Sequence, residues 1–113
     1  MKLGKKQELF ARQVPRLIDK AHELGFEVRL GDTFRDPRTH GEYGVKKGYG
    51  HYRSCHKLKT AIDLLLFKKG KYLTKTKDYE KLGFWWERQH IDNRWGGRFN
   101  DGNHFSMTHW GSM

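Results

Sequence analysis

Two histidines and two aspartates have the types and the spacing that metal-dependent chemistry requires. His56 stands seven residues before Asp63, and Asp101 stands three residues before His104. Asp63 interrupts an apolar run at 61–67 that is typical of a buried strand. A carboxylate in such a strand is unfavourable unless a partner satisfies it. Asp63 therefore either faces solvent or a lysine, or it binds a metal ion.

Taken as one set, His56, Asp63 and His104 match a catalytic zinc site, which has three protein ligands and leaves a fourth position to water. Zinc lowers the pKa of that water to about 7 and polarises a substrate carbonyl. We therefore expect one zinc ion per chain. Because the chain contains seven histidines in 113 residues, such a set can also arise by chance.

Asp101 and Arg35 are the candidate catalytic residues around this set. A tight turn between Asp101 and His104 would aim the carboxylate at the water, so Asp101 is the candidate general base and later the acid that protonates the leaving amine. Arg35 follows a predicted strand and can supply the cation that stabilises a tetrahedral oxyanion. The alternative for Arg35 is one more surface arginine in a basic protein.

The remaining cysteine and histidines have simpler interpretations. Cys55 precedes His56, but neighbouring residues of an extended segment point to opposite faces, so we expect a packed thiol rather than a Cys–His nucleophile. His51 lies in a long loop, where it either contacts substrate or has no role. His22 and His90 are expected on helix surfaces or ends, without a function.

Hydrophobic spacing predicts the elements that must position these residues. Apolar residues recur every three or four positions over 7–24, which is typical of an amphipathic helix, and Pro15 marks a kink or a restart in it. Residues 26–30 alternate and predict a strand. The segment 31–53 is rich in glycine and has little periodicity, so we expect a long loop that carries function.

The second half of the chain predicts a hairpin, a helix and a last strand. A polar turn follows the strand at 61–67 and leads to a return strand at 71–73. The helix predicted at 76–89 carries an aromatic stripe that we assign to the core. Residues 93–99 are expected to form a Gly-Gly turn, and 104–107 the last short strand. This order predicts an α+β fold with a small antiparallel sheet flanked by helices.

Length and charge limit the class of protein. The 113 residues suffice for a single domain, 1–113, with one modest core. The net charge of +10 indicates a polyanionic partner, and nucleic acid, an anionic membrane surface and an anionic wall polymer all fit. The single cysteine excludes an internal disulfide and a multi-cysteine zinc cage. We expect no membrane span and no signal peptide, and therefore synthesis in the cytoplasm.

Four short motifs occur in order along nearly the whole chain. They are Ser54-x-His56, Ala61-x-Asp63-Leu64, Trp95-Gly96-Gly97 and Asp101-x-x-His104-Phe105. Together with the opening helix and Thr33-Phe34-Arg35, they resemble the zinc peptidases of the D-alanyl-D-alanine carboxypeptidase family. The resemblance is closer to the phage endolysins of this family, the L-alanyl-D-glutamate peptidases. It implies the zinc peptidase fold that D-Ala-D-Ala peptidases share with Hedgehog-like proteins.

The resemblance also implies roles for individual residues. It assigns zinc to His56, Asp63 and His104, the catalytic base to Asp101 and stabilisation of the intermediate to Arg35. It places Ser54 beside the substrate, and His51 is a further candidate for substrate binding. Two departures concern the substrate: Ser106 stands where the family often has an acidic residue, and a glutamine often found after the arginine is not obvious.

These observations predict a zinc-dependent peptidoglycan hydrolase, an endolysin that cleaves the L-Ala-D-Glu bond of the stem peptide for host cell lysis. It would be a monomer made in the host cytoplasm that reaches the wall after the inner membrane is breached. A basic face would also attract anionic envelope polymers. The alternatives are a D,D-carboxypeptidase on the same scaffold, a structural wall-binding module, and a basic nucleic-acid-binding domain. The last is supported by aromatic residues in the basic loop, Phe34, Tyr43, Tyr49 and Tyr52, yet we expect no stable nucleic-acid complex.

Overall fold

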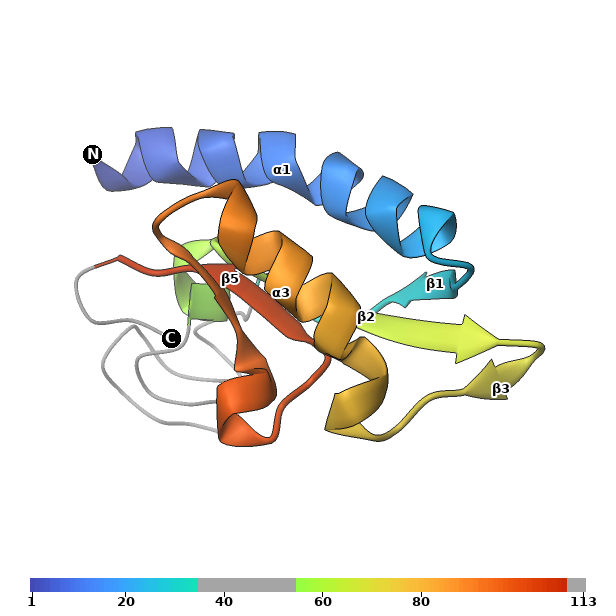
Figure 1. Cartoon of the computed structure of the whole chain (residues 1–113). Coiled ribbons are helices and arrows are strands. Elements are labelled where there is room, and N and C mark those ends of the chain that lie inside the picture. The colour runs from blue at the N-terminus through green and yellow to red at the C-terminus, as the bar shows by residue number, and fades with distance from the viewer. Residues whose placement is uncertain (35–54, 110–113) are drawn as a thin grey trace.

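A computed structural model of the chain describes residues 1–34 and 55–109, and it has the predicted α+β class (Figure 1). Within these two ranges, an antiparallel sheet carries two α-helices and three short 3-10 helices. In chain order the elements are α1 (Leu3–Glu23), β1 (Glu27–Leu30), η1 (Cys55–Leu58), β2 (Ala61–Lys68), β3 (Lys71–Tyr72), η2 (Thr76–Tyr79), α3 (Glu80–Gln89), β4 (Asn93–Trp95), η3 (Gly96–Phe99) and β5 (His104–Met107).

The long strand β2 is the centre of the sheet. The strand order is β1-β2-β5-β4, and β3 pairs with the far end of β2 through the predicted hairpin. In the β2–β5 pair, Asp63 lies directly opposite His104 and Ile62 lies opposite Phe105. The pairing of these two strands therefore joins residues that are 41 positions apart in the chain, since 104 − 63 = 41.

Side-chain alternation along β2 places its core residues and Asp63 on opposite faces of the sheet. Ile62, Leu64 and Leu66 of β2 are buried in the core with residues of α1 and α3, whereas Asp63 is only partly buried. Successive residues of a strand point to opposite faces. Asp63 and its partner His104 therefore lie on the face away from the core.

The helix α1 packs its predicted apolar stripe against the sheet, and Phe10, Leu17 and Ala21 are buried. It continues through Pro15, so the predicted restart does not occur; Pro15 is exposed and the packed residues on both sides keep the helix whole. Within the described parts of the chain, no helix is both long and apolar enough to cross a membrane.

Two local predictions were wrong. The segment at 93–99 is not a simple turn, because Asn93–Trp95 forms the strand β4 before the 3-10 helix η3. The indole ring of Trp95 packs directly against Gly83, and a β-carbon on residue 83 would overlap this ring. Residues Cys55–Leu58 form the 3-10 helix η1 and not an extended segment. Both elements are short and depend on tertiary contacts that no local pattern records.

Candidate metal centre

His56, the second residue of η1, is held by a backbone contact from a distant segment. Its side chain is fully buried, and Nδ1 lies 2.8 Å from the carbonyl oxygen of Thr33. A carbonyl oxygen can only accept a hydrogen bond, so Nδ1 carries the proton and donates it. In the neutral ring this tautomer leaves the lone pair of Nε2 pointing away from Thr33, as is common for metal-binding histidines.

Asp63 and His104 meet this nitrogen from two neighbouring strands. His56 Nε2 lies 3.1 Å from Asp63 Oδ1 and 3.2 Å from His104 Nδ1. His104 Nδ1 lies 3.5 Å from the same carboxylate oxygen. The side chains of Asp63 and His104 are 16% and 12% exposed, so the three groups converge just below the surface.

The geometry of this cluster fits a tetrahedral metal ion. Ligand atoms bound to tetrahedral zinc at about 2.0–2.1 Å lie about 3.3–3.4 Å from one another. The three observed separations of 3.1, 3.2 and 3.5 Å bracket that value. Two imidazoles and one carboxylate are also the donor set of catalytic zinc sites. This buried group can therefore hold a metal ion.

The electrostatics of the cluster are set by an ionised carboxylate that needs a proton or a cation beside it. Burial disfavours the ionised carboxylate of Asp63, but hydrogen bonds with His104 and His56 outweigh burial and lower the pKa of Asp63 well below its ordinary value of 3.8. Asp63 is thus an anion at neutral pH. An anionic oxygen and an imidazole lone pair can approach this closely only with a proton or a metal cation between them.

Two glycines allow the backbone to approach the cluster. The Gly31 amide donates to the carbonyl of Asp63 at 2.8 Å, and a β-carbon on Gly31 would lie 3.0 Å from that of Asp63. A β-carbon on Gly96 would overlap the carbonyl oxygen of Asp101 and lie 2.7 Å from the β-carbon of His104. Larger residues at these positions would displace the ligands.

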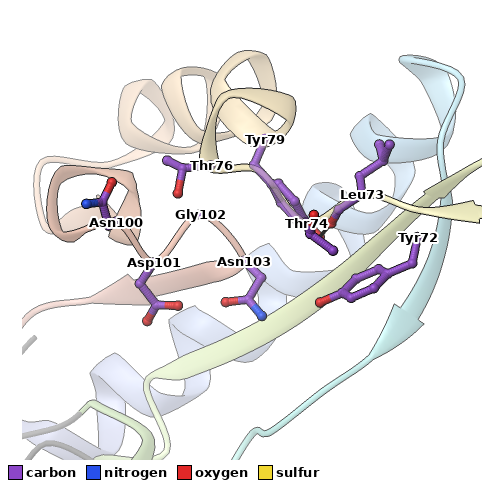
Figure 2. Close-up of a pocket in the computed structure, with 9 residues that line it drawn as sticks. All are labelled: Tyr72, Leu73, Thr74, Thr76, Tyr79, Asn100, Asp101, Gly102 and Asn103. Carbon is purple, nitrogen blue, oxygen red and sulfur yellow. Dashed lines mark hydrogen bonds between the residues drawn. The ribbon is translucent and has the colours of Figure 1, made fainter.

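Asp101 is brought next to the cluster by the predicted tight turn. The His104 amide donates to the Asp101 carbonyl oxygen at 3.1 Å, and the Asp101 amide donates to that of Gly96 at 2.9 Å. Asp101 is exposed, and among the described residues it is not one of those that converge on the metal position. Its carboxylate lines a pocket beside the turn (Figure 2).

Three other predicted site residues, Arg35, His51 and Ser54, lie outside the described residues. The chain leading to Arg35 does reach the metal centre, because Thr33 contacts His56. Of the aromatic residues that suggested nucleic-acid binding, only Phe34 is described, and it is half exposed, with the Lys59 ammonium 5.0 Å from its ring centroid. The roles predicted for these residues stay predictions.

The other cysteine and histidine predictions can be compared with the structure. Cys55 is fully buried and its thiol donates to the Met107 carbonyl at 3.3 Å, so the packed thiol is confirmed. The reason differs from the predicted one, since both Cys55 and His56 lie on η1. His22 is exposed on α1, as predicted. His109, to which no role was assigned, is buried, and burial and the nearby Lys6 lower its pKa.

The structure adds groups that support the site and that residue types did not identify. The Thr33 carbonyl could not be identified from the sequence, because every residue has a backbone carbonyl. Glu87 on α3 accepts hydrogen bonds from the Trp95 amide at 3.1 Å and from Arg98, and so holds the start of η3. The Trp95 indole donates to the Gly102 carbonyl at 2.7 Å. The Trp-Gly-Gly motif was the only sequence signal for this support.

No family model matches the chain, and no curated protein matches it.

Proposed function

We propose that this protein is a zinc-dependent peptidoglycan hydrolase that cleaves an amide bond of the stem peptide, with the L-Ala-D-Glu bond favoured. The observation that carries the proposal is the convergence of His56, Asp63 and His104 at separations that fit a tetrahedral ion. The motif order that resembles the endolysin branch of the zinc D-Ala-D-Ala peptidases also supports it. A D,D-carboxypeptidase on the same scaffold is the alternative.

In the proposed amide hydrolysis, the bound metal and Asp101 would have separate roles. Zinc, when bound, polarises the scissile carbonyl and makes water nucleophilic at neutral pH. Asp101 is the proposed base that accepts the water proton and passes it to the leaving amine. Its exposed position on the turn before His104 lets the carboxylate meet a substrate at the surface.

Three residues around the centre would bind the substrate. Arg35, two positions after Thr33, is the proposed donor to the oxyanion that the carbonyl oxygen becomes when water attacks the carbonyl carbon. Ser54 and His51 precede the η1 histidine in the chain and are proposed to contact the substrate. As an endolysin, the protein would act on the wall as a monomer after the inner membrane is breached.

The test is hydrolysis of purified peptidoglycan by metal-stripped protein, with and without added zinc, with the products resolved by mass. We expect zinc to restore cleavage and to produce a new free amine on D-Glu. The variant Asp101→Ala should keep one zinc per chain and lose about 10²–10⁴-fold in rate. His56→Ala should lose the metal. His22→Ala, which removes an exposed histidine from α1, should change neither the zinc content nor the rate of hydrolysis.

Each contradictory result has a separate meaning. Release of free D-Ala would favour the carboxypeptidase alternative. An active Asp101→Ala variant would remove Asp101 from the role of base. Absence of cleavage with zinc bound would refute the proposed activity, and salt-sensitive nucleic-acid binding by that inactive protein would favour the nucleic-acid alternative.

A further inference from the structure

A pocket beside the turn at 100–103 contains, apart from Asp101, no described residue with a role in the mechanism proposed above. It has a volume of about 160 Å³ and lies between the end of the β2–β3 hairpin and the turn at 100–103 that leads into β5 (Figure 2). Asp101 and Asn103 line it, and His104 follows directly in the chain. The pocket and the metal centre therefore share one turn, and a single substrate can reach both.

The walls of the pocket are held in place by close packing. Gly102 contacts η2 so tightly that a β-carbon there would lie 2.8 Å from the α-carbon of Thr76. On the other side the Tyr79 hydroxyl donates to the Leu73 carbonyl at 2.8 Å and accepts from the Leu66 amide at 3.1 Å. A pocket with walls held in this way binds its ligand with little ordering cost.

The lining favours a neutral ligand that both donates and accepts hydrogen bonds. Thr74, Thr76, Asn100 and Asn103 supply hydroxyl and amide groups, and Asp101 supplies a carboxylate. In the described part of the chain, no lysine, arginine or histidine lines the pocket, although the net charge of the protein is +10. An anionic ligand would meet one like charge here and no opposite charge, so it is disfavoured.

An aromatic ring closes one side of this polar pocket. Tyr72 is 42% exposed, and its ring packs against Phe67 at a centroid distance of 5.2 Å. Figure 2 shows its hydroxyl end pointing toward Asn103, with the side chains of Asn103 and Asp101 on the same side of the turn. Sugar rings present apolar C–H faces and a polar edge, which suits an aromatic ring beside amides and hydroxyls. The volume is close to that of a cavity of roughly 150 Å³ that holds one benzene ring, so a ring-sized group fits.

We propose that this pocket binds the acetylated amino sugar that carries the stem peptide. The inference rests on the proposed function and specifies it. In peptidoglycan L-Ala is joined to the sugar through a lactyl amide, so this end of the substrate is neutral and the L-Ala-D-Glu bond lies one residue from the sugar. A sugar bound beside Asp101 brings this bond, and not the distant terminal D-Ala bond, to the metal centre.

The test compares two soluble substrates of the zinc-loaded protein. One is the disaccharide-linked stem peptide, and the other is the same peptide with its L-Ala acetylated, which keeps the amide but removes the sugar. We expect a higher kcat/KM for the disaccharide-linked substrate. Tyr72→Ala and Asn103→Ala should each lower this preference about fivefold, the value of one polar contact. Ile91→Ala is the control, because Ile91 is 84% exposed and does not line the pocket.

A second measurement does not depend on hydrolysis. Oligosaccharides of N-acetylglucosamine without peptide should shift the NMR signals of the Asn103 side-chain amide, and less so in Tyr72→Ala. Equal cleavage of both substrates with no shift would overturn the sugar site and leave the proposed hydrolase intact. A shift without cleavage of either substrate would support the sugar site and refute the hydrolase. Neither shift nor cleavage would refute both.

Discussion

At the scale of single residues, backbone groups hold the three candidate metal ligands in place. The Thr33 carbonyl fixes the tautomer of His56, and Gly31 and Gly96 let the chain pass within contact of Asp63 and His104. Such supporting groups often change metal affinity by 10- to 100-fold, although they never touch the ion. Substitution of these glycines therefore tests the geometry of the site without removing a candidate metal ligand.

Gly96→Ala should weaken zinc binding by about 10- to 100-fold, because its methyl group would overlap the Asp101 carbonyl and displace His104. The same overlap should lower the free energy of unfolding by about 1–3 kcal/mol. Competition with a chelator measures the affinity, and urea denaturation measures the stability. Gly4→Ala is the control, because nothing lies within 4 Å of a β-carbon there and zinc affinity should not change. Unchanged affinity in Gly96→Ala would show that the turn tolerates displacement.

At the scale of elements, the helix α3 holds the segment that ends at the site. Trp95 lies between them: its amide donates to Glu87, its ring lies over Gly83, and its indole donates to the Gly102 carbonyl. Burial opposes ionisation of Glu87, but the hydrogen bonds from Arg98 and Trp95 outweigh burial and lower the pKa of Glu87 below its ordinary value of 4.5. The ionised carboxylate therefore connects α3 to β4 and η3.

Glu87→Gln should lower the free energy of unfolding by about 1 kcal/mol at neutral pH, a modest value because Arg98 is largely exposed. Since the pKa of Glu87 is lower in the folded state, its contribution is present above pH 4.5 and is lost as the pH falls below 4.5. The difference between wild type and variant should shrink accordingly in urea titrations at neutral and acidic pH. Glu23→Gln, which removes an exposed ion pair with Lys20, is the control with little effect at either pH. A pH-independent difference for Glu87→Gln would contradict the assignment.

At the scale of the whole molecule, α1 and α3 cover one face of the sheet, and the candidate metal centre lies on the other. The net charge of +10 adds a long-range attraction for polyanions. Some of this charge is carried by the exposed hairpin turn, where Lys68, Lys69 and Lys71 all face solvent. This charge supports the proposed attraction to anionic polymers of a bacterial envelope, whereas the pocket beside Asp101 is proposed to bind the neutral glycan.

Binding to a purified phosphodiester wall polymer should therefore weaken steeply as salt rises from about 0.05 to 0.5 M, because the Debye length falls from above 10 Å to below 5 Å. Replacing Lys71 by Gln and Lys69 by Asn should weaken it further. Asn is the suitable replacement for Lys69, whose φ of 52° lies in the left-handed region. Cosedimentation measures the binding. Salt-independent retention on the polymer would exclude this electrostatic mode, and hydrolysis of a short soluble peptide serves as the salt-insensitive control.

The sequence by itself determined the α+β class, the amphipathic helix, the hairpin after β2 and the last strand, because each depends on periodicity within a few residues. It also predicted the set His56, Asp63 and His104 and the tight turn from Asp101 to His104. These predictions rest on residue types and spacing, which are properties of the chain before it folds. The structure places all of these residues together.

Only the tertiary structure decided the contacts that give the site its geometry. The strand β4 was missed because its pairing and the fit of Trp95 against Gly83 come from segments distant in sequence. The Thr33 carbonyl at His56 and the pocket beside Asp101 could not be predicted either. A backbone carbonyl is the same in every residue, and a pocket is the space between elements. Both are therefore defined only when distant parts of the chain have packed together.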